Sequence, residues 1–244
     1  MADAAGAMAG PAAIITGGTG ALGSVVAGTF LAAGYRVAVT YRAEAEWEAL
    51  ASSSREAVAQ GKLRGHGANL TEEDSVRAAV DRTAETFGRL DVLVHVAGGY
   101  AGGTPLDATD ARVIRSMIDT NLVSAFLAAK HVIPHAKRRG RGRLLFISSR
   151  GALECYPGAS PYAAAKLGLH ALVQTLAKEL RRDGVTANAV LPSLIDTVAN
   201  RASMPGATFD DWVKPVAIAD LLLFLASEAA AATSGALVPI YGRA

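Results

Sequence analysis

The stretch Thr16-Gly17-Gly18-Thr19-Gly20-Ala21-Leu22-Gly23 begins at the end of a predicted strand over residues 12–16 and leads into a predicted helix over 22–33. Glycines at such a turn let backbone N–H groups approach a phosphate, whose charge the helix N-terminus favours. A plain strand-to-helix turn has the same letters, but the position after the first strand favours a dinucleotide pyrophosphate site. Its binding residues would be Gly17, Gly18, Thr19, Gly20, Ala21, Leu22 and Gly23.

Outward from this turn, short runs rich in Val, Ile and Leu alternate with longer stretches of helical period. Six further strands are predicted, at residues 35–41, 63–68, 90–96, 143–148, 185–191 and 237–240. The predicted helices lie at 43–60, after a cap at Thr71, and at 110–137, 161–182 and 216–227. This order predicts the α/β class: a doubly wound, Rossmann-like, seven-stranded parallel sheet with helices on both faces and ligands at the carboxyl ends of its strands.

The composition is that of one globular domain. The chain has 244 residues, of which 51% are hydrophobic and 19% charged, so it has enough apolar surface to bury a large core. Its net charge of +2 is too small to indicate nucleic-acid or membrane binding. We expect a flexible tail at residues 1–10 and a single dinucleotide-binding and catalytic domain at 11–244, with residues 193–212 as a substrate flap.

The few targeting and metal signals are negative. Cys155 is the sole cysteine and has no internal disulfide partner, which fits a reducing compartment. Residues 1–10 lack the basic start of a secretory signal, and no apolar run reaches the length of a membrane span. The five histidines show no metal-ligand spacing, so no metal is expected. These features predict a cytoplasmic protein.

The end of the second strand indicates which cofactor is used. An acidic side chain there would accept the ribose 2′-OH of NAD, but the chain has Tyr41 and then Arg42. A guanidinium suits bidentate contact with a 2′-phosphate. NADP is therefore the favoured cofactor and NAD a possible one, while a solvated Arg42 without a ligand is the alternative.

A candidate catalytic group combines four polar residues. Tyr162 and Lys166 are four positions apart, which places both side chains on one helix face. An ammonium about 6 Å from a phenol is expected to lower its pKa by about two units, towards the range useful to a general acid or base. Ser149 ends the fifth strand, where its hydroxyl would polarise a carbonyl oxygen, and Asn121 would hold a water behind the lysine. A helical surface pair, a turn cap and a buried amide are the corresponding structural explanations.

From about Ala12 to Gly242 the chain resembles the short-chain dehydrogenase/reductase family. Its glycine loop corresponds to 16–23, its Asn-Asn-Ala-Gly motif to 95–98, and its catalytic tetrad to Asn121, Ser149, Tyr162 and Lys166. The resemblance implies that Tyr162 donates or accepts the proton, Ser149 orients the substrate, Lys166 also holds the nicotinamide ribose and Asn121 joins a proton relay. It further implies cofactor contacts from Asn69, Leu70, Ala97, Gly98, Gly99, Pro192, Ile195 and Thr197.

Departures from the family pattern, at Ala21, His95-Val96, Asn69 and Ser193, are similar to the dihydropteridine reductases. Those enzymes lack the serine present here as Ser149, and have an aspartate where this chain has Tyr41. A quinonoid pterin would need a flat aromatic slot, for which Tyr100, Tyr156 and Trp212 are candidates; closing a flap over the core is the plainer role.

Three functions remain open. The first is an NADP-dependent hydride transfer to or from a small carbonyl or alcohol substrate, with Tyr162 as general acid/base. The second is reduction of a quinonoid dihydropterin, and the third is a dinucleotide-binding sensor without a reaction. Because apolar residues cover more than one face of the helix at 161–182, we also expect a homodimer or homotetramer.

Overall fold

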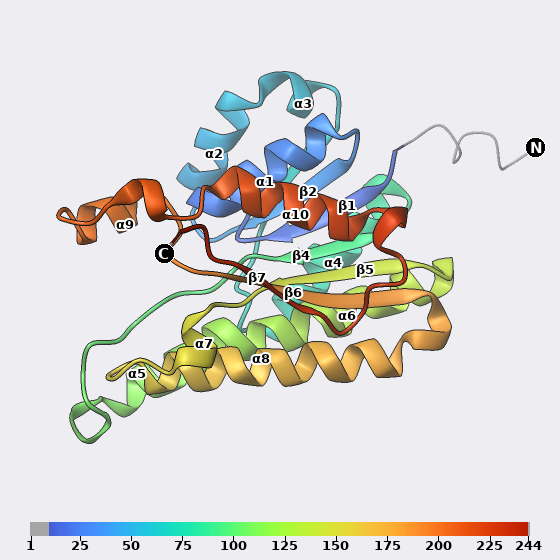
Figure 1. Ribbon diagram of the computed structural model, residues 1–244. Helices are drawn as coiled ribbons and strands as arrows, with labels where there is room; N and C mark the ends of the chain where they lie inside the picture. Colours follow the sequence, from blue (N-terminus) through green and yellow to red (C-terminus); the bar gives the residue numbers. More distant parts are fainter. Residues whose placement is uncertain (1–9, 244) are drawn as a thin grey trace, which may run out of the picture.

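A computed structural model describes residues 10–243, so all of the predicted tail except Gly10 lies outside the described residues. Seven parallel strands form one sheet in the order β3-β2-β1-β4-β5-β6-β7, in a single domain (Figure 1). The predicted fold class is confirmed. The strands are β1 (Ala12–Thr16), β2 (Arg36–Tyr41), β3 (Leu63–Gly67), β4 (Val92–His95), β5 (Gly142–Ile147), β6 (Val185–Pro192) and β7 (Leu237–Ile240).

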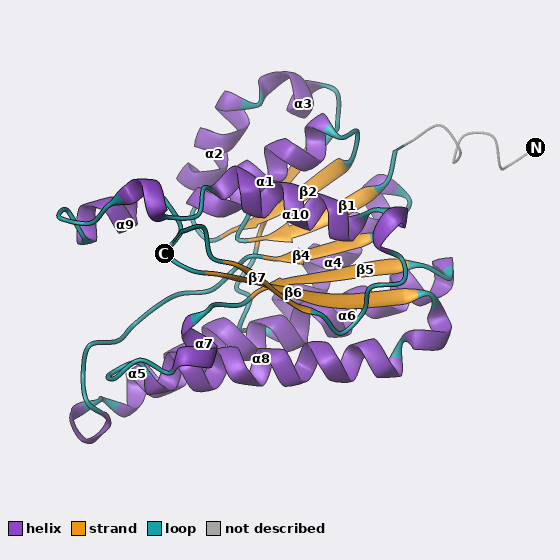
Figure 2. Cartoon of the chain, in the orientation of Figure 1, coloured by secondary structure: helices purple, strands orange, loops and turns teal. Residues whose placement is uncertain are grey.

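Helices cover both faces of this sheet (Figure 2). One face carries α1 (Ala21–Ala32), α2 (Glu44–Ser53), α3 (Arg55–Ala59) and α10 (Pro215–Ala226). The other carries α4 (Glu73–Phe87), α6 (Ser124–Arg139) and α8 (Ser160–Glu179). Short helices α5 (Ala111–Ile118), α7 (Gly151–Glu154) and α9 (Val198–Ser203) stand near the carboxyl ends of the strands in Figure 1.

Two apolar cores result, one on each side of the sheet. Alternate residues of each strand face opposite sides, so Ile14 and Leu144 belong to one core while Ile15 and Leu145 belong to the other. All four side chains are buried, as expected for central parallel strands covered on both faces. Because the strands are parallel, their carboxyl ends lie along one edge of the sheet.

The sheet reverses its order between β1 and β4. From β1 the chain moves outward to β2 and β3, then returns to pair β4 with the other side of β1. At such a switch point the loops after neighbouring strands diverge and leave a crevice. The turn after β1 and the loop after β4 therefore border the expected ligand site.

Local differences from the expected elements have simple causes. The predicted helix at 43–60 is broken at Ser54. Thr71 is not a helix cap, because its hydroxyl donates to Asn69 Oδ1 at 2.8 Å, and the cap position of α4 is taken by Glu72. The predicted helix at 110–137 contains a π-helical turn, Asp119–Val123, between α5 and α6.

The expected irregular stretch after β6 contains some regular structure. Helix α9 begins after Thr197, whose Oγ1 accepts a hydrogen bond from the Asn200 backbone N–H at 3.2 Å. A 3-10 turn at Phe209–Asp211 follows. The four-residue helix α7 was not predicted, because a segment so short shows no period.

Candidate active site

The glycine-rich turn folds tightly against the start of α1. Gly17 has φ of +64°, a conformation that residues with a Cβ rarely adopt. A Cβ on Gly18 would lie 2.5 Å from Val39 Cγ1, and one on Gly23 would collide with the Gly17 carbonyl oxygen. Close packing therefore requires glycine at these positions, and the turn can approach a ligand with its backbone there.

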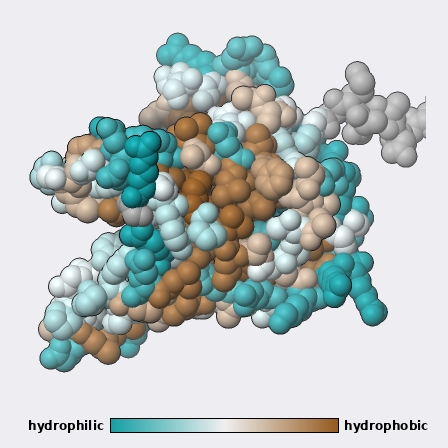
Figure 3. Space-filling view, viewed as in Figure 1, coloured by the Kyte–Doolittle hydropathy of each residue, from teal (hydrophilic) through white to brown (hydrophobic). Residues whose placement is uncertain are grey.

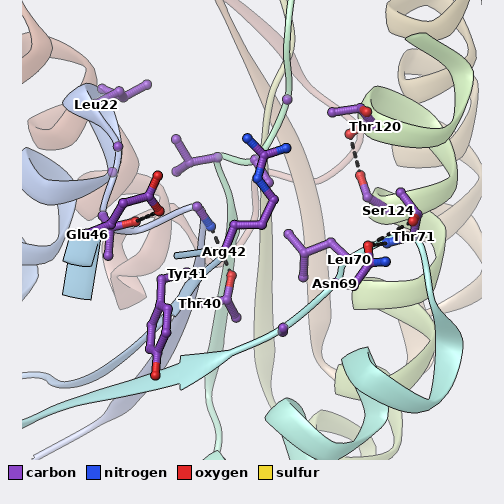
Figure 4. A pocket seen from close by; sticks show the side chains of 18 of the residues that line it. Leu22, Thr40, Tyr41, Arg42, Glu46, Asn69, Leu70, Thr71, Thr120 and Ser124 are labelled. Atoms are coloured by element: carbon purple, nitrogen blue, oxygen red, sulfur yellow. Dashed lines mark hydrogen bonds between the residues drawn. The ribbon is translucent and has the colours of Figure 1, made fainter. Parts of the chain in front are cut away.

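A cavity of about 430 Å³ opens over this turn at the switch point (Figure 4). It runs from the turn, past the ends of β2 and β3, to the loop after β4 and to α6. The cofactor residues predicted from the sequence that line it are Gly17, Thr19, Gly20, Ala21, Leu22, Gly23, Tyr41, Arg42, Asn69, Leu70, Ala97 and Gly98. The lining residues not predicted are Thr40, Glu46, Ala68, Thr71, Val96, Thr120 and Ser124.

The other predicted cofactor residues lie outside that lining. Gly18 is held against Val39, and Gly99 is bound to Asn121. Pro192 ends β6, and Ile195 and Thr197 follow it at the same edge of the sheet. Tyr162 and Lys166 stand on α8, outside the cavity lining. The cavity is therefore lined by the residues predicted to bind the adenosine and pyrophosphate parts of the cofactor.

Arg42 and Tyr41 stand where the cofactor choice was predicted to be made. The Arg42 side chain is exposed and extends across the cavity in Figure 4. The Tyr41 ring stacks on Trp47, with 6.2 Å between ring centres, and its hydroxyl donates to Glu44 Oε2 at 2.6 Å. The Arg42 guanidinium therefore lines the cavity at the end of β2, whereas the Tyr41 hydroxyl is engaged by Glu44.

On the opposite wall, Asn69 shapes the loop after β3. Its Oδ1 accepts from the Thr71 N–H and its Nδ2 donates to Glu72 Oε1 at 2.7 Å. The backbone N–H of Asn69 donates to Ser75 Oγ at 2.9 Å. These bonds hold the loop that places Asn69 and Leu70 in the cavity lining.

Three of the predicted catalytic side chains meet beyond the other end of the cavity. The Ser149 hydroxyl, at the end of β5, is hydrogen-bonded to Tyr162 on α8. Lys166 is one helical turn further along α8, with Nζ 5.9 Å from the centre of the Tyr162 ring. Its ammonium donates to the Ile147 carbonyl oxygen at 2.9 Å. The sequence spacing thus places these groups together.

The expected fall in the pKa of Tyr162 is not found. Burial raises the pKa of Tyr162, and a hydrogen bond from Ser149 offsets only part of that effect. Burial also lowers the pKa of Lys166 to about 8. Desolvation opposes charge on both groups, whereas the expectation rested on the ammonium–phenol attraction alone.

Asn121 lies in the π-helical turn and is fully buried. Its Nδ2 donates to the carbonyl oxygens of Gly99 and Met117, and its Oδ1 accepts from the Gly99 N–H at 3.1 Å. A Cβ on Gly98 would lie 2.8 Å from that Oδ1 and 3.3 Å from Lys166 Nζ. Asn121 therefore fixes the loop after β4 beside the lysine; its predicted water-holding role stays a prediction.

His95, one of the departures from the family pattern, joins the end of β4 to the end of β1 and the start of α6. Its Nδ1 lies 2.9 Å from Thr16 Oγ1 and its Nε2 lies 3.2 Å from Ser124 Oγ. Ser124 in turn donates to the Thr120 carbonyl oxygen at 2.6 Å. Burial and then the charge of Lys166 lower the pKa of His95 to about 3, so the ring is neutral at physiological pH.

The three aromatic residues predicted to contact substrate are differently placed. Tyr100 is 66% exposed and its ring meets that of Tyr162 edge to face, 5.1 Å between centres. Tyr156 is exposed and its hydroxyl donates to Glu154. Trp212 is only 5% exposed and packs against Phe209. Tyr100 thus stands nearest to the catalytic phenol.

Asp196, between Ile195 and Thr197, anchors the predicted flap. It forms ion pairs with Arg201 and Lys214, which hold its pKa far below the usual range. The Asp196 N–H donates to the Val213 carbonyl oxygen at 2.8 Å. Asp196 therefore joins the segment that carries Ile195 and Thr197 to the residues directly after the flap, Val213 and Lys214.

Within residues 10–243, no cluster of three or more His, Cys, Asp or Glu side chains is arranged to hold a metal ion. None of the helices described there is both long and apolar enough to span a bilayer.

The doubly wound sheet, the glycine-lined cavity and the Ser-Tyr-Lys group define a dinucleotide-dependent oxidoreductase. The family model described as short chain dehydrogenase matches residues 11–207. The chain belongs to the short-chain dehydrogenase/reductase family, as the sequence resemblance implied.

Individual relatives agree over nearly the whole chain. The 2-(R)-hydroxypropyl-CoM dehydrogenase of Xanthobacter autotrophicus is 31% identical, covering 94% of this chain and 96% of the relative. The 3-oxoacyl-[acyl-carrier-protein] reductase MabA of Mycobacterium tuberculosis is 32% identical, covering 94% and 90%. The solved structure of ElxO with NADP bound superimposes with a TM-score of 0.87 at 27% identity, covering 95% and 97%.

Proposed function

We propose that this oxidoreductase transfers hydride between NADP and a small substrate that interconverts a carbonyl and an alcohol. The observation that carries the proposal is the meeting of Ser149, Tyr162 and Lys166 at the carboxyl edge of the sheet. The names of its relatives, a hydroxypropyl dehydrogenase and an oxoacyl reductase, support the same pair of functional groups.

The protein's own residues fit a dinucleotide. Gly17, Gly18 and Gly23 leave no room for a Cβ, and the turn precedes a helix N-terminus that favours phosphate. We infer that this turn holds the pyrophosphate, that Asn69 and Leu70 flank the adenine, and that Ile195 and Thr197 meet the nicotinamide carboxamide. When bound, the reduced cofactor supplies the hydride.

The proton is handled by α8 and the end of β5. In reduction, the Tyr162 hydroxyl gives its proton to the oxygen of the substrate carbonyl as the hydride reaches the carbon. The Ser149 hydroxyl orients that oxygen, and Lys166 stabilises the phenolate that Tyr162 becomes. Alcohol oxidation uses the same steps in reverse, with the proton returning to Tyr162.

The test is turnover by the purified protein with NADPH and a panel of ketones, aldehydes, 3-oxoacyl thioesters and a quinonoid dihydropterin. We expect loss of NADPH absorbance with at least one ketone. Absence of turnover across the panel, together with tight cofactor binding, would favour the sensor function instead. The dihydropterin is included because Tyr100 presents an exposed ring beside Tyr162.

The preference for NADP rests on Arg42. Replacing Arg42 with Ala is expected to weaken NADPH binding by about tenfold or more, because one charge-assisted contact to the 2′-phosphate is lost. Binding of NADH should change little. Calorimetric titration of both cofactors measures the two effects, and equal losses would remove Arg42 from the 2′-phosphate site.

We further propose a homodimer or homotetramer. Most apolar residues of α8 are buried within this chain, which leaves Ala164, Leu167 and Ala171 exposed. Figure 3 shows apolar side chains gathered where α10 and β7 lie in Figure 1, and Phe224 there is 52% exposed. Light scattering on a sizing column tests this, and a monomer mass would refute it. The cytoplasmic location stays a prediction.

A further inference from the structure

Glu46 places a carboxylate in the cofactor cavity, although the end of β2 itself carries no acidic residue. It belongs to the first turn of α2, five residues after β2 ends, and lines the same cavity as Arg42. Figure 4 shows Glu46 beside the glycine-rich turn and Arg42 reaching across the opening. The strand-end rule did not find Glu46 because α2 folds this residue back over the strand end.

A hydrogen bond joins Glu46 to the glycine-rich turn. Thr19 Oγ1 in the glycine-rich turn donates to Glu46 Oε2 at 3.1 Å. The neighbouring acid Glu44 is bound elsewhere, to the Tyr41 hydroxyl, and does not line the cavity. Glu46 is thus the carboxylate that faces a nucleotide held by the turn.

The charges around this end of the cavity nearly balance. Arg42 favours a 2′-phosphate, whereas Glu46 repels it. The adjoining depression adds little net charge. Its lining contains Arg115 together with Asp119, and its Arg112 is paired with Asp110. A carboxylate beside a ribose also accepts hydrogen bonds from its free 2′-OH. Glu46 therefore acts in the opposite sense to Arg42.

We propose that Glu46 is a specificity-determining residue that weakens NADPH binding and supports NADH, so that the protein uses both cofactors. This inference rests on the proposed dinucleotide-dependent function. Glu46 retains its contact with Thr19 when the ribose carries a hydroxyl, and must move aside when the ribose carries a phosphate.

The experiment compares Glu46→Gln with the matched control Glu44→Gln by calorimetric titration of the ligand-free protein with NADPH and with NADH. Both substitutions remove one negative charge from the same helix turn, but only one removes it from the cavity. We expect Glu46→Gln to tighten NADPH binding about tenfold, which is 1.4 kcal/mol. Its affinity for NADH should stay equal or fall up to about threefold, and thermal unfolding of both variants verifies that they fold.

Each outcome is decisive. A tenfold gain for NADPH in Glu46→Gln alone supports the inference. Equal shifts in Glu46→Gln and Glu44→Gln would overturn it, because they would show only a long-range charge effect. Weaker NADPH binding in Glu46→Gln would also overturn it. If the unaltered protein bound neither cofactor, the proposed function would fail first and this inference with it.

Discussion

At the amino end of the sheet, Asp91 lies buried between two arginines, whereas at the carboxyl end Lys166 is buried with an uncharged partner. Asp91, just before β4, pairs with Arg89 and Arg139 and accepts from the Ala12 N–H at 2.8 Å. Lys166 donates to a carbonyl oxygen, and no ion pair in residues 10–243 includes it. The buried carboxylate at the amino edge is therefore paired with cations, whereas the buried ammonium at the carboxyl edge is bonded to a neutral carbonyl group.

The two groups shift in ways that follow from these partners. Burial alone would raise the pKa of Asp91, but the hydrogen bonds from Arg89 and Ala12 and the two positive charges outweigh it and lower the pKa. Burial without a counter-ion lowers the pKa of Lys166 to about 8. The buried charge at the amino edge is thus compensated by cations, whereas the buried ammonium at the carboxyl edge has no counter-ion among residues 10–243.

The largest expected effect is at the carboxyl edge. Replacing Tyr162 with Phe removes the proton that the substrate oxygen receives, so kcat should fall by about 10²- to 10⁴-fold. Cofactor affinity and the free energy of unfolding should change little, because the ring still packs against Tyr100. Steady-state kinetics and cofactor titration measure this. Undiminished turnover would contradict the role given to Tyr162.

The next effect is at the amino edge. Replacing Asp91 with Asn leaves Arg89 and Arg139 without their carboxylate, and breaking a buried ion pair costs about 3 kcal/mol of unfolding free energy. Turnover of the folded variant should be normal, because Asp91 is at the far end of the sheet. Urea unfolding measures the loss. A variant as stable as the original protein would show that the cluster contributes nothing.

The same cluster predicts an acid limb of the stability profile. The pKa of Asp91 is lower in the folded than in the unfolded chain, so the stabilisation is present above the unfolded value near 4. It is lost as pH falls through the folded value. Asp91→Asn should lack this part of the loss, and parallel profiles for both proteins would contradict the assignment.

Lys166 predicts the opposite limb of the stability profile, with an effect of similar size. Its folded pKa of about 8 lies below the unfolded value near 10.4, so folding disfavours the ammonium, fully so below pH 8. Stability should rise relative to Lys166→Met, by about 3 kcal/mol, as pH rises from 8 to 10.4. Thermal unfolding across this range measures the difference. A constant difference between the proteins would show that Lys166 is not desolvated.

The smallest effect is again at the amino edge. Arg139 is the more exposed of the two cations on Asp91, with 38% of its side chain exposed against 17% for Arg89. Replacing Arg139 with Gln should cost less than about 1 kcal/mol, as for other solvated ion pairs. Arg89→Gln is the matched comparison and should cost more. The reverse order in urea unfolding would contradict this ranking.

Much of the fold was predictable because its signals are local. Apolar runs located all seven strands, with β1 and β7 matching their predicted bounds. The glycine turn was found because its glycines stand together directly after the first strand, and Gly23 is confined by the neighbouring Gly17 and Gly18. The four-residue spacing of Tyr162 and Lys166 likewise defines one helix face.

Other features depend on contacts distant in sequence. Glu46 lines the cavity beside Thr19, 27 residues away in the sequence, to which it is hydrogen-bonded. The His95 ring joins Thr16 to Ser124 across the switch point. The pKa of Tyr162 was predicted in the wrong direction because burial depends on how completely α8 packs on the sheet.

The sequence by itself determined the order of strands and helices, the glycine turn and the chemistry of the catalytic side chains, because each depends on residues close together in the chain. The tertiary structure alone decided the charge balance of the cavity, the desolvation of Lys166 and the pairing of the buried Asp91 with Arg89 and Arg139. These depend on which distant groups share a low-dielectric space, and no spacing along the chain specifies that.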